Sequence, residues 1–125
     1  EGGFESTKKL LKNDITAIFC ADDIMAFGCL DYIKRHTKLS VPKHIEIIGY
    51  DDISTANWHS YNLTTVRQPI QKMSKLITQI IDDSLKDPEF EPINYLLQGK
   101  FVLHAPTPLA VKVNTSGVQL LLNDS

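Results

Sequence analysis

The sequence has few of the features that mark specialised classes of protein. It contains 2 cysteines in 125 residues, too few for a disulfide scaffold, and we expect Cys20 and Cys29 to be buried thiols in a reducing compartment. Its longest apolar run, 24–30, is far shorter than the roughly 18 residues of a membrane span. The 13 basic and 15 acidic side chains give a net charge of −2, without the basic excess of nucleic-acid-binding domains. This segment therefore reads as a globular domain that contacts neither membrane nor nucleic acid.

Signatures of catalysis and of metal binding are also missing. There is no G-x-S-x-G, H-E-x-x-H, Walker or G-x-G-x-x-G pattern. The four histidines show no metal-ligand spacing: His36, His44, His59 and His104. We expect no enzyme activity, no metal and no cofactor. A carbohydrate-active enzyme is kept as an alternative because paired carboxylates can act as acid and base, and turnover of candidate sugars would reveal it.

What is present is a β-α-β pattern in the first half of the chain. Two β-prone runs without polar alternation, 16–20 and 45–50, predict strands that are covered on both faces. The segment between them predicts a helix that Asp22 or Asp23 caps and that runs to about His36. Because a helix joins two strands at this spacing, we expect an α/β fold with a parallel sheet.

Further elements are predicted on both sides of this unit. A short amphipathic helix over 4–12 precedes it, and 63–67 predicts a third strand. Pro69 then begins the clearest amphipathic helix of the chain, which ends at Asp87-Pro88. Beyond it, β structure is predicted in three runs: 95–103, 109–113 and 118–122.

The middle helix has no polar face over its first two turns, because 24–30 holds only apolar residues and glycine. A helix on one face of a sheet normally shows polar residues on its outer side. We interpret the pattern as burial against a second subunit, with burial inside a larger domain as the alternative. The chain also lacks an initiating methionine and begins within a predicted helix, so we expect it to be part of a longer protein.

Two acidic side chains follow neighbouring parallel strands. Asp22 comes after the first buried run and Asp51 after the second. The carboxyl ends of parallel strands meet at one edge of a sheet, which is where ligands bind in open α/β sheets. Two carboxylates there suit a polyhydroxylated ligand, because they accept hydrogen bonds from neighbouring hydroxyls. The alternative, equally weighted, is that Asp22 only caps its helix and Asp51-Asp52 only shapes a turn.

Three motifs occur in order along the chain: TAIFCADDIMA at 16–26, VPKHIEIIGYDD at 41–52 and LTTVRQP at 63–69. Together they resemble segments of the lactose/galactose-repressor (LacI/GalR) family of bacterial transcription regulators, over roughly 3–108. The resemblance implies part of a doubly wound parallel-sheet, two-lobed domain similar to periplasmic sugar-binding proteins. On that basis, 1–67 would be part of the C-terminal lobe, 68–103 would cross back to the N-terminal lobe, and 104–125 is an unassigned tail.

The resemblance also implies an effector site and a dimer interface. Asp22 and Asp51 would bind a sugar effector between the lobes, and Gln68 would lie beside the cleft. The family usually has Asn where this chain has Asp22, which only accepts hydrogen bonds when ionised, and this departure bears on which effector is bound. Dimer contacts would come from three residues: Phe27, Trp58 and His59.

The function that the resemblance implies is a cytoplasmic, homodimeric repressor of a sugar-catabolism operon. Its effector would be a small carbohydrate, for example of the sucrose type, or a sugar phosphate, and it would bind operator DNA through an N-terminal helix-turn-helix outside this chain. The alternative is a periplasmic-type sugar-binding protein of a transport system. A helix-turn-helix or a leader peptide in the preceding coding sequence would separate the two. Alone, this segment is expected to expose apolar surface and to associate or fold poorly.

Overall fold

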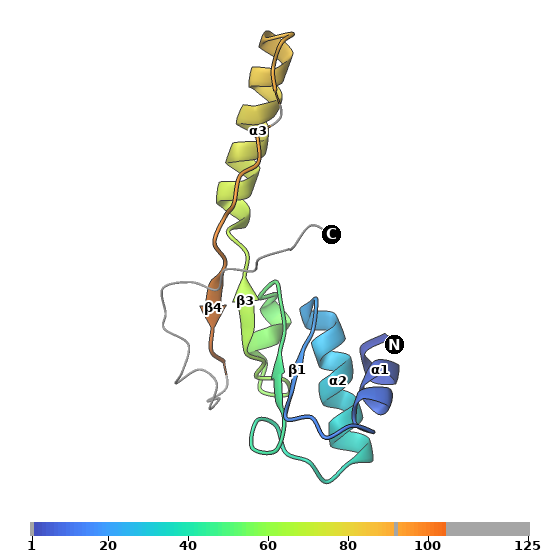
Figure 1. The fold of residues 1–125 in the computed structure, drawn as a ribbon. Coiled ribbons are helices and arrows are strands. Elements are labelled where there is room, and N and C mark those ends of the chain that lie inside the picture. Colours follow the sequence, from blue (N-terminus) through green and yellow to red (C-terminus); the bar gives the residue numbers. More distant parts are fainter. Residues whose placement is uncertain (1, 92, 105–125) are drawn as a thin grey trace.

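The computed structural model describes residues 2–91 and 93–104. Its elements follow one another in the order α1 (Gly2–Leu10), β1 (Ala17–Phe19), α2 (Asp23–His36), β2 (Glu46–Ile48), the 3-10 helix η1 (Ser54–Asn57), β3 (Thr65–Arg67), α3 (Ile70–Lys86) and β4 (Lys100–Val102). The first six elements and β4 form a body, from which α3 projects (Figure 1). The β-prone runs predicted at 109–113 and 118–122 lie outside the described residues.

The four strands form two two-stranded sheets, β1-β2 and β3-β4. β1 pairs in parallel with β2, with Ile18 opposite Ile47. Two parallel bridges, Ile48–Thr64 and Asp51–Arg67, connect β2 to the segment of β3. β4 closes the row as an antiparallel partner of β3. The predicted β-α-β unit with parallel strands is therefore present, and the fold is of the α/β class.

The core lies between the β1–β2 pair and α2. Ile18 and Ile47 of the strands are buried there, and α2 contributes Ala26, Cys29 and Ile33 from one face. The other face of β1 is open, since Phe19 is 55 % exposed. The prediction that this strand is covered on both faces is therefore wrong within the described residues, because α2 packs against one face only.

α1 covers part of the apolar outer side of α2. The two helices approach so closely that a Cβ at Gly3 would lie 2.1 Å from the Met25 carbonyl oxygen, and a Cβ at Gly28 would lie 2.9 Å from the Phe4 nitrogen. Ile24, on the first turn of α2, is still 69 % exposed. Part of the apolar outer side of α2 is thus buried by α1 of the same chain. The exposed part is still available for the predicted contact with a second subunit.

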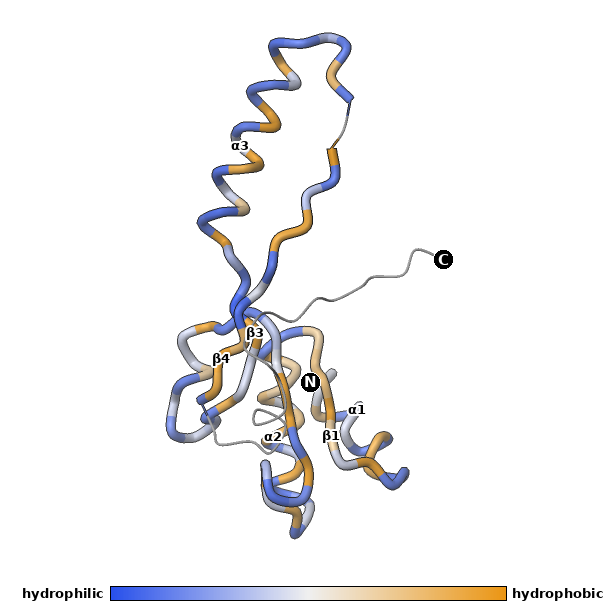
Figure 2. The backbone as a smooth tube through the Cα atoms, turned by 60° about the vertical axis from the view of Figure 1, so that its left-hand side comes forward, coloured by the Kyte–Doolittle hydropathy of each residue, from blue (hydrophilic) through white to orange (hydrophobic). Residues whose placement is uncertain are grey.

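α3 has no buried residue. Hydrophobic residues recur along the α3 backbone, as the colouring of Figure 2 shows. Residues spaced four apart, the exposed Ile77, Ile81 and Leu85, form an apolar stripe. The chain then returns alongside α3 into β4, as Figures 1 and 2 both show. The predicted strand over 95–103 is wrong in its first half, because only Lys100–Val102 finds a strand partner. None of the described helices combines the length and the apolar character needed to cross a bilayer.

Candidate functional site

The three predicted effector residues lie at one edge of the sheet. Asp22 follows β1, Asp51 follows β2, and Gln68 comes directly after β3. Two hydrogen bonds fix this alignment: Asp23 N donates to Tyr50 O at 2.9 Å, and Asp51 N donates to Val66 O at 2.9 Å. α2 begins at this edge and α3 leaves the body from it (Figure 1). We refer to Asp22, Asp51 and Gln68 as the rim.

Two of the rim residues are in direct contact. The Gln68 side-chain amide donates to Asp51 Oδ1 at 2.5 Å. Asp51 has a φ of 119° and Asp52 a φ of 58°, in the left-handed region that residues other than glycine rarely adopt. Such conformations cost about 1–3 kcal/mol each and are found where surrounding contacts enforce them, often at functional sites. The turn after β2 is therefore held in a strained form that presents Asp51 to Gln68.

Asp52 makes a separate cluster beside the rim. Its carboxylate accepts a hydrogen bond from Arg67 Nε and lies 2.9 Å from His104 Nε2. Its side chain is only 5 % exposed. Burial alone would raise the pKa of Asp52, but the hydrogen bonds from His104 and Arg67 outweigh burial and hold this pKa below its ordinary value. Asp52 is thus a carboxylate that stays ionised inside the structure.

Asp22 and Asp23 also have different surroundings, as Asp51 and Asp52 do. Asp22 Oδ1 accepts a hydrogen bond from Met25 N at 2.6 Å and caps α2, so the capping interpretation holds for this oxygen. Asp23 is fully buried, and its carboxylate accepts from Thr65 Oγ1 at 2.5 Å and from Ile53 N at 2.9 Å. A Cβ at Gly49 would lie 2.2 Å from Asp23 Oδ1. Glycine is therefore required there for this carboxylate to tie α2 to β3.

Asp23 and Asp52 were not singled out as site residues from the sequence. The available signal was the doubling of the acid in both motifs. In each pair the first carboxylate lies at the rim and the second one accepts hydrogen bonds that hold the neighbouring elements together. One carboxylate per pair is sufficient for a ligand contact. The second carboxylate of each pair therefore indicated a structural role.

The rim has the chemistry to accept hydrogen bonds from hydroxyl groups. Carboxylate oxygens of Asp51 and Asp22, together with the amide oxygen of Gln68, supply acceptors just beyond the ends of three strands. A hydrogen bond to a charged group contributes about 1.5–3 kcal/mol. Within the described residues, no group of three or more His, Cys, Asp or Glu side chains could hold a metal ion. The arrangement suits a polar small molecule that carries several hydroxyl groups.

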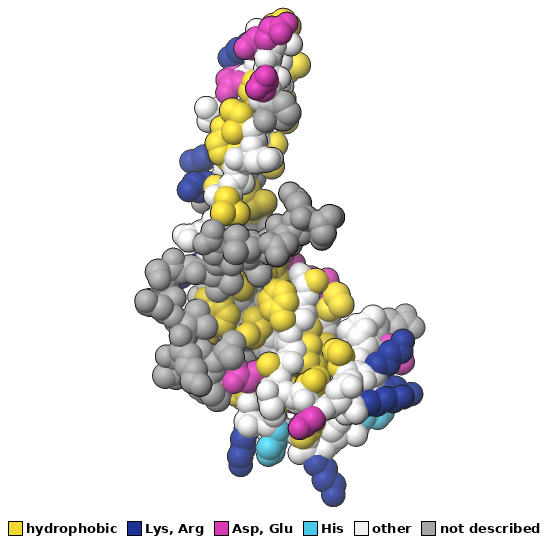
Figure 3. All heavy atoms as spheres, in the orientation of Figure 1, with side chains coloured by type: hydrophobic (Ala, Val, Ile, Leu, Met, Phe, Trp, Pro, Cys, Tyr) yellow, Lys and Arg dark blue, Asp and Glu magenta, His cyan; other side chains and the backbone are white. Residues whose placement is uncertain are grey.

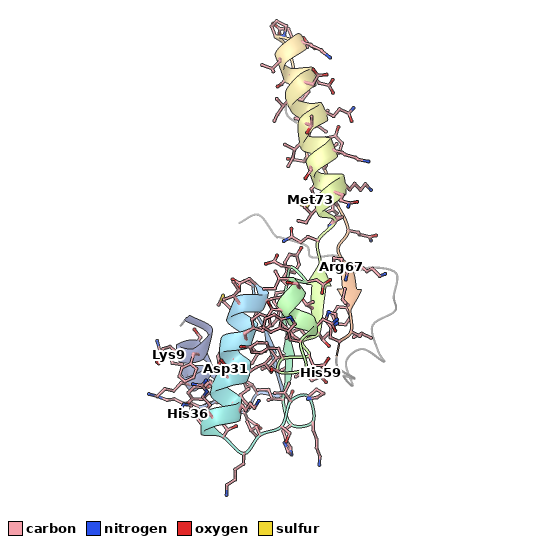
Figure 4. All side chains as sticks on the ribbon, turned by 180° about the vertical axis from the view of Figure 1, so that it is seen from behind. Lys9, Asp31, His36, His59, Arg67 and Met73 are labelled. Carbon is pink, nitrogen blue, oxygen red and sulfur yellow. The ribbon has the colours of Figure 1, made fainter. Side chains whose placement is uncertain are left out.

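The three residues predicted to form a dimer interface lie on α2 and the loop after η1. Phe27 stacks on Tyr61 of the same chain, with ring centroids 4.2 Å apart. Trp58 is 60 % exposed, and His59 is exposed at the edge of a groove of about 420 Å³. No rim residue lines this groove. Figure 4 shows His59 well away from Arg67, which lies at the end of the body next to α3.

Comparison with known proteins places this geometry in a family. Residues 2–104 match the periplasmic binding protein-like domain. The HTH-type transcriptional repressor PurR of Vibrio campbellii is 34% identical over an alignment of 111 residues, which covers 82% of this chain and 33% of the repressor. The chain spans about a third of the length of the curated relatives that it matches.

Solved structures show the same similarity. A LacI family transcriptional regulator from Enterococcus faecium, with bound ribose, is 31% identical with a TM-score of 0.67, over 81% of this chain and 37% of that one. The lac repressor dimer bound to operator and to the anti-inducer ONPF is 28% identical with a TM-score of 0.67, over 80% of this chain and 30% of that one.

Proposed function

Because the chain belongs to the periplasmic binding protein-like domain family, in the form found in the effector-binding domains of LacI-family regulators, we propose that it senses a small carbohydrate for a transcription repressor. The observation that carries this proposal is the contact between Asp51 and Gln68 at the rim. These side chains belong to two of the three family motifs. They also offer the hydrogen-bond acceptors that a sugar requires.

The described residues supply one side of the effector site. In this proposal, 1–67 belong to the C-terminal lobe, and 68–103 cross to the N-terminal lobe and return; 104–125 are not assigned. The exposed apolar stripe of α3 supports this division, because a soluble protein rarely leaves such a face without a partner. The effector would bind between the lobes, next to the point where α3 leaves the sheet.

The proposed mechanism is a change in the balance between two lobe arrangements. A ligand shifts such a balance only by binding one arrangement more tightly than the other. The sugar would contact the rim on one lobe and residues of the other lobe, and would so favour one arrangement of a homodimer. Operator binding would follow through a helix-turn-helix outside this chain, in the cytoplasm, at a sugar-catabolism operon. The similar proteins are regulators rather than enzymes, and the proposed role is binding without catalysis.

The proposal is tested by Asp51→Ala in the full-length protein. Removing the carboxylate deletes the acceptor shared by Gln68 and the sugar, so effector affinity should fall at least about 10-fold, which is 1.4 kcal/mol. Titration calorimetry with ribose, cellobiose, sucrose and their phosphates measures it, and gel-shift titration measures operator binding, which should be unchanged.

Asp82→Ala is the matched control, because Asp82 pairs with Lys86 on the exposed surface of α3, away from the rim. It should keep the wild-type sugar response. An Asp51→Ala protein that still responds to the same sugar at the same concentration would contradict the proposed site.

A further inference from the structure

Asp51 and Asp52 are consecutive residues whose carboxylates have different partners. Asp51 accepts a hydrogen bond from Gln68 at the rim. Asp52 is held by Arg67 and His104 and is almost completely buried. Nothing in the proposed sugar contact uses Asp52. The buried ionised side chain therefore requires a separate explanation.

We propose that Asp52 is a positioning residue for the effector site: its contacts with Arg67 and His104 hold the turn that directs the Asp51 carboxylate to Gln68 and to the sugar. The inference deepens the proposed function of the rim and rests on it. Asp52 itself does not touch the effector.

The backbone gives the first argument. Both residues of the turn have positive φ values, 119° at Asp51 and 58° at Asp52. Neither is glycine, so this conformation is unfavourable and has to be maintained by surrounding contacts. The sheet fixes one side of the turn, because Asp51 N donates to Val66 O. On the other side, the side-chain contacts of Asp52 hold it to Arg67 and His104.

The origin of the two partners gives the second argument. Arg67 ends β3, just before the chain leaves the body towards α3. His104 lies two residues after β4, the strand into which the returning segment leads. Asp52 therefore joins the end of the outgoing strand β3 and the residue beyond the incoming strand β4 to the turn that carries Asp51. A lobe movement that displaces either strand would loosen the turn, so the cluster couples effector contact to lobe arrangement.

The test uses Asp52→Asn, which keeps the shape of the side chain and removes its charge. The first measurement needs no ligand. In the NMR spectrum of the full-length protein, the side-chain amide resonances of Gln68 should move towards those of a solvent-exposed glutamine, because Asp51 turns away. Asp82→Asn, which removes an exposed charge paired with Lys86, should leave the Gln68 resonances unchanged.

The second measurement is a double-mutant cycle on sugar affinity. Asp52→Asn alone should weaken binding about 10-fold, corresponding to 1.4 kcal/mol. In an Asp51→Ala background, the same change should alter affinity less than about 2-fold, because Asp52 acts only through Asp51. General destabilisation would weaken binding equally in both backgrounds.

Each outcome decides the inference. A wild-type Gln68 spectrum and affinity in Asp52→Asn would overturn it, and so would an equal loss in the Asp51→Ala background. If Asp52→Asn does not fold, Arg67→Gln and His104→Gln replace it, with the same expectations. If no sugar binds the wild-type protein, the proposed function fails, whereas the ligand-free Gln68 signal still decides whether Asp52 positions Asp51.

Discussion

At the level of single residues, the two Asp-Asp pairs divide ligand contact and support between neighbours. Asp22 and Asp51 lie at the rim, and Asp23 and Asp52 are tied into the body. The side chains of adjacent residues point in different directions from the backbone, so one acid of each pair points into the protein. A buried carboxylate is tolerated only when donors surround it, and both inward acids have two.

Asp23→Ala should destabilise the protein more than Asp22→Ala. The first change leaves Thr65 Oγ1 and Ile53 N without their acceptor in a buried place, and we expect a loss of about 2–4 kcal/mol in the free energy of unfolding. The second removes a helix cap and should cost about 1 kcal/mol. Urea-induced unfolding followed by circular dichroism measures both. The opposite ranking would show that Asp23 does not tie α2 to β3.

The sequence predicted the burial of the two cysteines but not the contact between them. Both are buried, as predicted. Their sulfur atoms also lie 3.5 Å apart, which joins the end of β1 to α2. The hydrogen bond to Cys29 and burial raise the pKa of the Cys20 thiol. The two cysteines are nine positions apart in the chain, and only the packing of α2 on the sheet brings them together.

At the level of elements, the contact between α1 and α2 depends on glycine. Gly3 faces the Met25 carbonyl, where a methyl group has no room. Gly2, the preceding residue, has open space around the position of a Cβ. Two adjacent glycines in one helix therefore have different roles, and this makes them a matched pair for mutation.

Gly3→Ala should destabilise the protein, although alanine is the better helix former. Overpacking at such a contact costs about 1–3 kcal/mol because α1 has to move away from α2. Gly2→Ala should be neutral or slightly stabilising. Thermal unfolding of the two variants beside the wild type measures the difference, and equal melting temperatures for the two variants would rule out the close approach.

Most of the described helices and strands followed from local patterns. Hydrophobic periodicity located α1 and α3, and a capping acid, Asp22 or Asp23, marked the start of α2, where the structure shows Asp22 as the cap. The 3-10 helix η1 was not predicted. The segment before β4 was predicted as part of a long strand, but Tyr95 and Leu96 are exposed and unpaired with any strand of the described residues. β propensity reports a suitable side chain and not the presence of a neighbouring strand.

At the level of the whole molecule, large apolar side chains are exposed in several places. Figure 3 shows them on the body as well as along α3. Two of them are Ile24, which precedes Phe27 on α2, and Trp58, which follows η1. We propose that the face formed by Phe27, Trp58 and His59 is the homodimer interface, distinct from the rim.

Trp58→Glu tests this interface more cleanly than a change at Phe27, because Trp58 is largely exposed within the chain and Phe27 packs on Tyr61. A buried charge in the interface should weaken the dimer at least about 10-fold, or 1.4 kcal/mol. Sedimentation velocity over a range of concentrations measures it, with Lys38→Glu, also an exposed residue, as the control. If Trp58→Glu dimerises with the same affinity as the control, the proposed interface is wrong.

The sequence of residues within each segment was sufficient to predict the β-α-β unit, the helices and the position of Asp22 and Asp51 at a common edge of the sheet. These follow from periodicity, capping and the fixed direction of parallel strands, all of which act between near neighbours. The strained turn that sends Asp51 and Asp52 to different partners, the burial of Asp23 and the contact of the two cysteines became visible only in three dimensions. They arise from side chains that are far apart in the chain, such as Asp52 and His104, and packing of the sheet brings them within hydrogen-bond distance.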